Sequence, residues 1–286
     1  MDFAEQVGSV LIWVGLLKVL QLSLWPYLKP TLGRYAYPVA YPVSLLLYTL
    51  IAWYGTLLSV PMQLSVLPFL GLGLAGVLKG RYTLGELRGQ LVWDAVFLVG
   101  FLFMLEVRFV NPVINYFSEQ YMNHAFIASI MRHPQVPPLD PWFSGEHLSV
   151  YYYLGHFMMG SLGILSGIPS EVVFNLVLPT VFGLALVMLY ATGDLVLERW
   201  RWLPMLTLLL VPPSVIWFLA EKHDIYASFQ QTNWIIPGAR VEFPLFSFLL
   251  GNAHAFEIGL FNQILLVFLV AFASLRWETL SGRGRM

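Results

Sequence analysis

The side chains best suited to chemistry in this sequence gather in two segments, residues 111–170 and 221–256. All six histidines lie in them, together with six of the carboxylates. A carboxylate or an imidazole can move a proton to or from a reacting hydroxyl, and an arginine can bind a phosphate through paired hydrogen bonds. Both segments are also rich in Trp, Tyr, Phe and Pro, which favours packing at a membrane surface over plain solvated loops. We therefore expect a functional site in these two segments.

Two carboxylates are the candidates for catalysis. Asp140 lies between Pro138 and Pro141, which hold it in an extended or turn segment, and Trp142 follows as an interface anchor. We expect Asp140 to be the catalytic carboxylate, with Glu119 as the second candidate. The alternative for Asp140 is a structural role, as the acceptor in a turn or cap.

Further side chains in the two segments are expected to contact a substrate. They are Asn123, His124, Trp142, Glu146, Tyr151, Tyr152, Tyr153, His156, Arg240, Glu242, Asn252 and His254. For a phosphate, the available cations are Arg240, Arg132 and Arg108. An interface belt is the alternative to a binding role for the three tyrosines.

Whether the site holds a metal is left open by the sequence. A set drawn from Asp140, Glu119, His156 and His254 would suit Mg²⁺ or Mn²⁺, since it combines hard oxygen ligands with imidazole. No pair of histidines has the spacing of zinc ligands, and the chain has no Cys. A thiolate or zinc-type site is therefore not expected.

The elements that position these residues must be membrane helices. Of the 286 residues, 58% are hydrophobic and only 11% are charged, and the mean hydropathy is +0.72. An average soluble domain is about 25% charged, and a soluble globule of this size could not hide so much apolar surface. The net charge of −1 also argues against a nucleic-acid partner. The composition predicts an all-α polytopic integral membrane protein whose main partners are lipids.

Seven segments have the length and apolarity of a membrane span, about 20 residues. They are residues 7–25, 38–57, 60–78, 91–110, 171–196, 204–220 and 257–275. An eighth apolar segment, 151–168, is short, and we expect it to be a re-entrant or juxtamembrane helix. The predicted organisation is one membrane domain, 1–286. It comprises four spans (1–110), an outer loop (111–170), two spans (171–220), a second outer loop (221–256), and a last span with a tail (257–286).

The basic residues predict the orientation of these spans, because Lys and Arg favour short cytoplasmic loops. If 151–168 does not cross, 10 of the 15 basic residues fall on one side. This places the N-terminus outside the cell membrane, the C-terminus in the cytoplasm, and both polar segments at the outer face. The intramembrane charges Asp94, Glu106 and Arg108 lie near the ends of their span, so we expect them to snorkel to the headgroups.

Two glycine patterns have simple structural explanations. Gly71-Leu-Gly-Leu-Ala-Gly76 fits a dinucleotide fingerprint, but it lies inside an apolar span, so we expect a helix-packing face. Gly163 and Gly167 form a small-xxx-small pair, for which we also expect helix packing.

Three runs of residues carry a resemblance to a known family. They are Glu119-Gln-Tyr-Met-Asn-His-Ala-Phe126, Pro137-Pro-Leu-Asp-Pro-Trp-Phe-Ser-Gly145 and Tyr151-Tyr-Tyr-Leu-Gly-His156, with further matches at 167–169, 174–176 and 242–254. These runs resemble a largely uncharacterised family of archaeal and Chloroflexi membrane proteins with a Tyr-Tyr-Tyr signature. That family is similar to the GT-C glycosyltransferases. The resemblance implies transfer of a sugar from a polyprenyl-phosphate donor at the outer face, with an acidic catalytic residue in the first outer loop.

The chain departs from the family pattern at two carboxylates and one histidine. Asn123 and Asn252 stand where the family has Asp, and Phe256 stands where it has His. An amide cannot act as a general base. The alternative function is therefore a non-catalytic or partial relative that binds a lipid-linked glycan or serves as a structural subunit. Because relatives continue for several more spans, a partner subunit or a missing C-terminal portion is also expected. A transporter is disfavoured, since the spans show no internal repeat.

Overall fold

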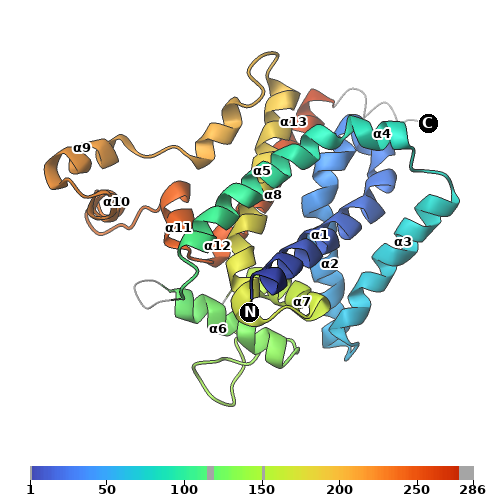
Figure 1. The fold of residues 1–286 in the computed structure, drawn as a ribbon, viewed down its shortest axis with the longest axis horizontal. Coiled ribbons are helices and arrows are strands. Elements are labelled where there is room, and N and C mark those ends of the chain that lie inside the picture. Colours follow the sequence, from blue (N-terminus) through green and yellow to red (C-terminus); the bar gives the residue numbers. More distant parts are fainter. Residues whose placement is uncertain (1, 115–118, 150–151, 277–286) are drawn as a thin grey trace.

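The computed structural model describes residues 2–114, 119–149 and 152–276, and its described elements are helices (Figure 1). The α-helices are α1 (Phe3–Leu32), α2 (Ala36–Leu57), α3 (Leu67–Leu78), α4 (Leu84–Gly89), α5 (Leu91–Val110), α6 (Gln120–Arg132), α7 (Leu154–Ser166), α8 (Ser170–Val196), α9 (Pro213–Lys222), α10 (Ile225–Asn233), α11 (Pro244–Leu250), α12 (Ala255–Ile258) and α13 (Leu260–Leu275). Three 3₁₀ turns, η1 (Gly33–Tyr35), η2 (Met62–Val66) and η3 (Leu203–Leu208), complete the set. The prediction of an all-α fold is confirmed for this part of the chain.

Helix α8 is the central element of the bundle. It has 27 residues and begins after Pro169, whose fixed φ suits the residue before a helix. Of its most apolar 18-residue stretch, 83% is buried inside the protein. The corresponding share is 39% for Phe3–Leu57 and 28% for Ala255–Leu275. Around it pack α2, α5, α6, α7 and α13. Helix α8 is therefore mostly enclosed by protein, whereas the surrounding helices keep more of their apolar surface exposed.

Three helical stretches are long and apolar enough to cross a membrane: Phe3–Leu57, Ser170–Val196 and Ala255–Leu275. The first contains α1 and α2, joined by η1. These stretches cover four of the predicted spans, so an integral membrane location is supported. The predicted span 60–78 is a 3₁₀ turn followed by α3, and the predicted span 91–110 is α5, which carries three charges. The total of seven spans stays a prediction.

The prediction of one helix over residues 204–220 is wrong. The structure has the 3₁₀ turn η3 at its start, then a break, and then α9. Pro204, Pro212 and Pro213 are the cause, because proline lacks an amide hydrogen and its ring excludes the α conformation from the residue before it. Helices α9 and α10 pack on each other and project to the left of the bundle (Figure 1).

Helix α7 is the short element expected within 151–168. Its 13 residues rise about 20 Å, less than the roughly 30 Å of a bilayer core. Three glycines let neighbours approach closely: a Cβ would lie 3.0 Å from Ile258 at Gly155, 2.9 Å from Ile130 at Gly160 and 2.7 Å from Met131 at Gly163. Helix α7 is thus set tightly against α6 and α12.

Two of the glycine expectations have different outcomes. Gly73 and Gly76 approach Ser23 and Tyr82 within 3 Å of an added Cβ, so the 71–76 run is confirmed as a packing face. Gly167 instead ends α7 in the left-handed conformation, with φ +70°, and the predicted packing role is wrong there. Helices often end with a residue in this conformation, which lets backbone amides satisfy the last carbonyls.

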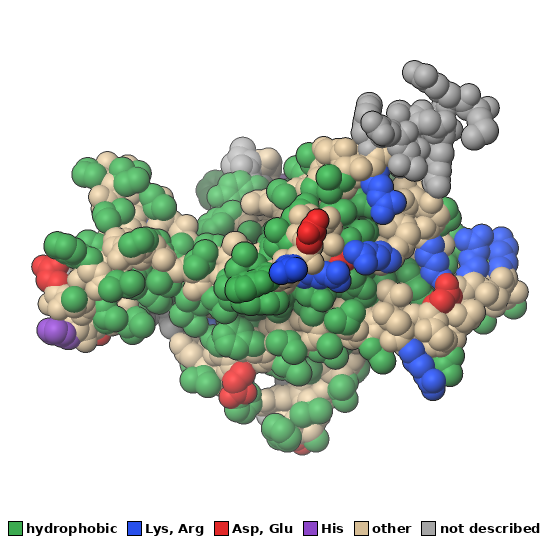
Figure 2. Space-filling view, turned by 90° about the horizontal axis from the view of Figure 1, so that it is seen from above, with side chains coloured by type: hydrophobic (Ala, Val, Ile, Leu, Met, Phe, Trp, Pro, Cys, Tyr) green, Lys and Arg blue, Asp and Glu red, His purple; other side chains and the backbone are tan. Residues whose placement is uncertain are grey.

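The basic segments meet at one end of the bundle, opposite α6 and α7 (Figure 1). Lys29 pairs with Glu86 at 3.1 Å, while Arg34 and Arg201 both pair with Asp194 at 2.5 and 2.7 Å. Lys and Arg side chains gather over this end in the view from above (Figure 2). The structure therefore groups basic residues that the topology assigned to one side, among them Lys29, Arg34 and Arg201. Which side faces the cytoplasm stays a prediction.

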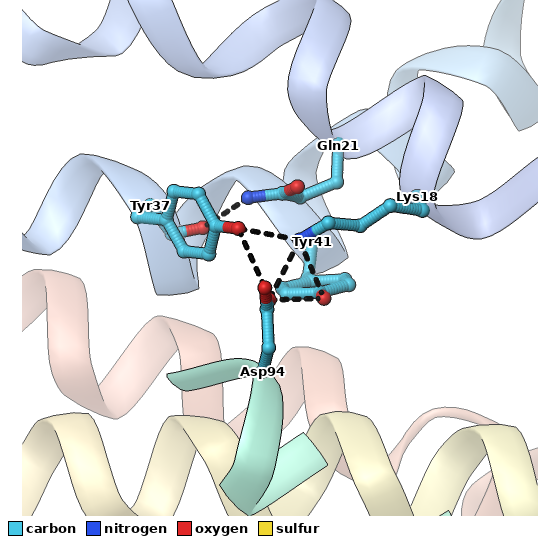
Figure 3. A network of polar contacts seen from close by, with 5 residues as sticks. All are labelled: Lys18, Gln21, Tyr37, Tyr41 and Asp94. Atoms are coloured by element: carbon cyan, nitrogen blue, oxygen red, sulfur yellow. Dashed lines mark hydrogen bonds and ion pairs between the residues drawn. The ribbon is translucent and has the colours of Figure 1, made fainter. Parts of the chain in front are cut away.

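A polar network joins α1, α2 and α5 inside the bundle (Figure 3). Lys18 Nζ lies 2.6 Å from Asp94 Oδ1, and the hydroxyls of Tyr37 and Tyr41 each donate to that carboxylate at 2.8 Å. Gln21 donates to the Tyr37 carbonyl at 3.1 Å. The expectation that Asp94 snorkels is wrong, because the cation of α1 and two hydroxyls of α2 satisfy it locally.

Substituting one partner of the Lys18–Asp94 ion pair should destabilise the fold strongly. We expect Lys18→Met or Asp94→Asn to lower the free energy of unfolding by about 3 kcal/mol each, because the remaining charge loses its counter-ion. The double variant should lose clearly less than the sum. Reversible unfolding in mixed micelles measures both. The control is Lys29→Met, which removes the exposed ion pair with Glu86. It should lower the free energy of unfolding by less than about 1 kcal/mol. Additive losses at Lys18 and Asp94 would contradict the coupling.

Candidate functional site

Five of the predicted site residues lie together where α6, α7 and the turn before α12 meet. They are Glu119, Asn123, His156, Asn252 and His254, and we call them the polar cluster. Asn123 Oδ1 lies 3.1 Å from His156 Nε2, and His254 Nδ1 lies 3.0 Å from Glu119 Oε2. Asn123, His156 and Asn252 are fully buried. Segments that are far apart in the sequence thus supply one centre.

The turn that brings Asn252 and His254 into the cluster depends on Gly251. This residue ends α11 in the left-handed conformation, with φ +75°, which is strained for any residue with a side chain. A Cβ there would lie 1.9 Å from Arg108 Nη1. Gln120 closes the turn from α6 by donating to the Leu250 carbonyl at 2.5 Å. Beyond the turn, His254 is the residue before α12, and its amide donates to Glu257 Oε2 at 3.1 Å.

His156 holds the buried side of the cluster together. Its Nε2 lies 3.0 Å from the Ala253 carbonyl as well as 3.1 Å from Asn123 Oδ1. A carbonyl can only accept, so Nε2 carries the hydrogen and donates. Burial, helped by the nearby His254 and opposed by the hydrogen bond to the Ala253 carbonyl, lowers the pKa of His156 to about 4. At neutral pH His156 is therefore a neutral donor that joins α6, α7 and the 251–254 turn.

Glu119 and His254 form the accessible side of the cluster. The Glu119 side chain is 51% exposed and that of His254 is 10% exposed. The Phe256 ring stacks on the His254 ring with centroids 5.3 Å apart, which holds the imidazole in place. A carboxylate on Nδ1 orients an imidazole and stabilises its protonated form. This pair can take up a proton from a bound hydroxyl.

Asp140 lies in a separate turn. Its Oδ1 accepts the amides of Trp142 at 2.8 Å and Phe143 at 3.2 Å, and its own amide donates to the Glu146 carbonyl at 2.9 Å. Trp142 and Glu146 are exposed there. Among the described residues, no hydrogen bond or ion pair joins this turn to the polar cluster. The geometry is that of the structural alternative, an acceptor in a turn.

Arg240 and Glu242 pair with each other rather than with the cluster. Arg240 Nη2 lies 2.5 Å from Glu242 Oε1, and its guanidinium lies 5.9 Å from the centre of the Trp234 ring. Glu242 also accepts from Ser247 Oγ at 3.2 Å. The Glu242 carboxylate therefore neutralises the Arg240 guanidinium, which we expected to bind a phosphate.

The remaining predicted residues lie around the cluster in separate contacts. His124 Nε2 is 3.3 Å from Ser170 Oγ; burial lowers the pKa of His124, and Glu171 opposes that shift. Tyr153 Oη accepts from Trp53 Nε1 at 3.2 Å, and Tyr152 is exposed. Tyr151 lies outside the described residues. The tyrosine triplet is thus divided between packing and surface.

Glu257 is a buried neighbour that the site prediction did not include. It is 3% exposed, and its Oε1 has no hydrogen-bond partner among the described residues. It follows His254 by three residues, which is the spacing of a capping box, so this signal was present in the sequence.

Within the described residues, no group of three or more His, Asp or Glu side chains is placed to hold a metal ion.

Comparison with known proteins gives the family. The sequence profile described as an uncharacterized membrane protein family, DUF2298, matches residues 44–286. The chain belongs to this family. The DUF2298 match includes part of α2, all of α3 to α13, and every residue of the polar cluster. No curated protein matches the chain, and no solved structure does.

Protonation of His156 should destabilise this DUF2298 protein. The pKa of about 4 in the folded state lies below the 6.5 of a free histidine, so the unfolded state binds more protons between these values. We expect the free energy of unfolding to fall by about 3 kcal/mol as the pH drops from 6.5 to 4. Unfolding in detergent at several pH values measures this.

The control is His156→Gln, which keeps a side-chain donor near Ala253 but does not titrate. Its unfolding should lose most of the pH dependence in this window. An equal pH dependence in the two proteins would show that His156 is not the group responsible.

Proposed function

We propose that this protein is a GT-C-like membrane glycosyltransferase that takes a sugar from a polyprenyl-phosphate donor. The observation that carries the proposal is the Glu119–His254 pair, a carboxylate 3.0 Å from an imidazole at the accessible edge of a buried polar cluster. The motif series shared with the Tyr-Tyr-Tyr family supplies the substrate class. The proposed setting is the outer membrane face, where the predicted topology places both polar segments.

The pair would act as the general base for the acceptor. The acceptor oxygen attacks the anomeric carbon of the sugar, the bond from that carbon to the phosphate oxygen breaks, and the lipid phosphate leaves with the electron pair. His254 Nε2 takes the proton of the acceptor hydroxyl, and Glu119 stabilises the imidazolium that forms. Such proton transfer contributes about 10²- to 10⁴-fold to a rate.

Glu119 is better placed for this role than Asp140. One oxygen of Asp140 already accepts two backbone amides in its turn, whereas Glu119 is half-exposed and oriented on an imidazole. Asp140 and its neighbours Trp142 and Glu146 would then shape the loop beside the site, and Arg240 and Glu242 would shape the segment before α11. The buried residues Asn123, His156 and Asn252 would position His254.

A non-catalytic role is the second candidate, because the cluster contains amides where the resembled family has carboxylates. Asn123 Nδ2 and Asn252 Oδ1 are buried without hydrogen-bond partners among the described residues. Unsatisfied amide groups of this kind are costly unless something binds them. In this role the cluster would hold the hydroxyls of a lipid-linked glycan, or a partner subunit, without transfer.

The two candidates differ in a transfer assay in proteoliposomes with a polyprenyl-phosphate sugar. For the transferase, Glu119→Gln and His254→Asn should each lower the rate at least about 100-fold, since the base loses its proton acceptor or its orienting charge. Asp140→Asn keeps an acceptor in the turn and should change the rate less than about threefold.

The wild-type protein bound to glycan but without transfer would support the non-catalytic role. Loss of transfer in Asp140→Asn with full activity in Glu119→Gln would overturn the assignment of the base. Unfolding of each variant in detergent controls for misfolding.

A further inference from the structure

A groove of about 590 Å³ runs along the bundle between α1, α5 and α8. Most of its wall is aliphatic or aromatic, with Val10 and Leu11 from α1, Leu102 and Leu105 from α5, and Leu176 from α8. One end is different, because Arg108, Glu171, Asn175 and Gln6 meet there. The groove therefore has the polarity of an amphiphile: an apolar wall beside a small polar patch.

Arg108 is the unusual member of that patch. It is 3% exposed, and both Nε and Nη2 donate to Asn175 Oδ1 at 3.0 and 2.6 Å. No carboxylate pairs with it among the described residues, since Glu171 is exposed and accepts from Ser170 at 3.4 Å. A buried cation without a counter-ion is costly. An anion that enters the groove would supply the missing charge.

The packing around Arg108 holds it in this position. Its Nη1 contacts the turn at Gly251, where a Cβ would lie 1.9 Å away. Gln120 Nε2 lies beside the same position and closes the turn through the Leu250 carbonyl. Because Glu119 precedes Gln120 and His254 follows this turn, the polar end of the groove adjoins the polar cluster.

We propose that this groove binds a lipid with a phosphate headgroup, with the phosphate on Arg108 and the hydrocarbon tail along the apolar wall. Charge complementarity and the apolar lining select this occupant: a neutral lipid leaves Arg108 uncompensated, and free phosphate leaves the apolar wall uncovered. Guanidinium groups bind phosphate oxygens through directed hydrogen bonds. The site stands whether or not the protein transfers a sugar.

Lipid retention by the full chain in detergent tests the proposal by native mass spectrometry. The probes are dioleoyl phosphatidic acid, neutral dioleoylglycerol and inorganic phosphate. We expect phosphatidic acid to be retained at least about tenfold more than dioleoylglycerol, with inorganic phosphate competing only weakly. Equal retention of the two lipids, or displacement of phosphatidic acid by equimolar inorganic phosphate, would overturn the proposal.

Matched variants locate the site. Arg108→Gln should lower retention of phosphatidic acid at least about tenfold, and Arg88→Gln, which changes an exposed arginine on α4, should leave it unchanged. Leu102→Trp fills the groove and should also lower retention, whereas Val99→Trp, one turn earlier on α5, should not. Leu102 and Val99 are both exposed, so the two tryptophan variants should fold even if Arg108→Gln does not. Full retention in Leu102→Trp would contradict the location.

Discussion

The Lys18–Asp94 ion pair is the constraint on which the arrangement of α1, α2 and α5 depends. Charges inside a bilayer have no water to stabilise them, so protein groups must supply every contact. Each charge comes from a different helix, and the hydroxyls of Tyr37 and Tyr41 on a third helix complete the shell. These contacts constrain how the three helices lie relative to one another. Helices α1 and α5 also form two walls of the groove.

The polar cluster depends on a second kind of constraint, the close approach of backbones. Gly155 and Gly160 let α7 lie against α12 and α6, and Gly251 lets the turn before α12 lie against Arg108. With these distances fixed, one imidazole, that of His156, can reach acceptors on two neighbouring segments. The same packing that removes His156 from water leaves Glu119 at the edge. A rigid buried side and an accessible side therefore arise from a single arrangement.

The sequence predicts long apolar helices well, because burial in lipid or protein needs only continuous hydrophobicity. Residues 38–57 and 171–196 are helical as expected. Residues 204–220 do not form one continuous helix, because three prolines interrupt the apolar pattern there. The sequence placed Asn123, His156 and His254 among many expected substrate contacts, and the structure brings these three close together. The motifs could not show that Asp140 accepts amides of its own turn or that Arg240 is neutralised by Glu242, because both depend on local side-chain geometry. The partners of Asp94 were equally hidden, since they come from two other helices.

The shortness of α7 has a consequence for the order of events during biosynthesis. With 13 residues it is shorter than the roughly 20 residues that a membrane span needs, so its place depends on the helices that pack on it. Its packing partners α8 and α12 are made after it, and only their arrival gives His156 the Ala253 carbonyl as a partner. The polar cluster can therefore assemble only after the segment that carries Ala253 and His254 has been synthesised. Nascent chains stopped before residue 253 will lack it.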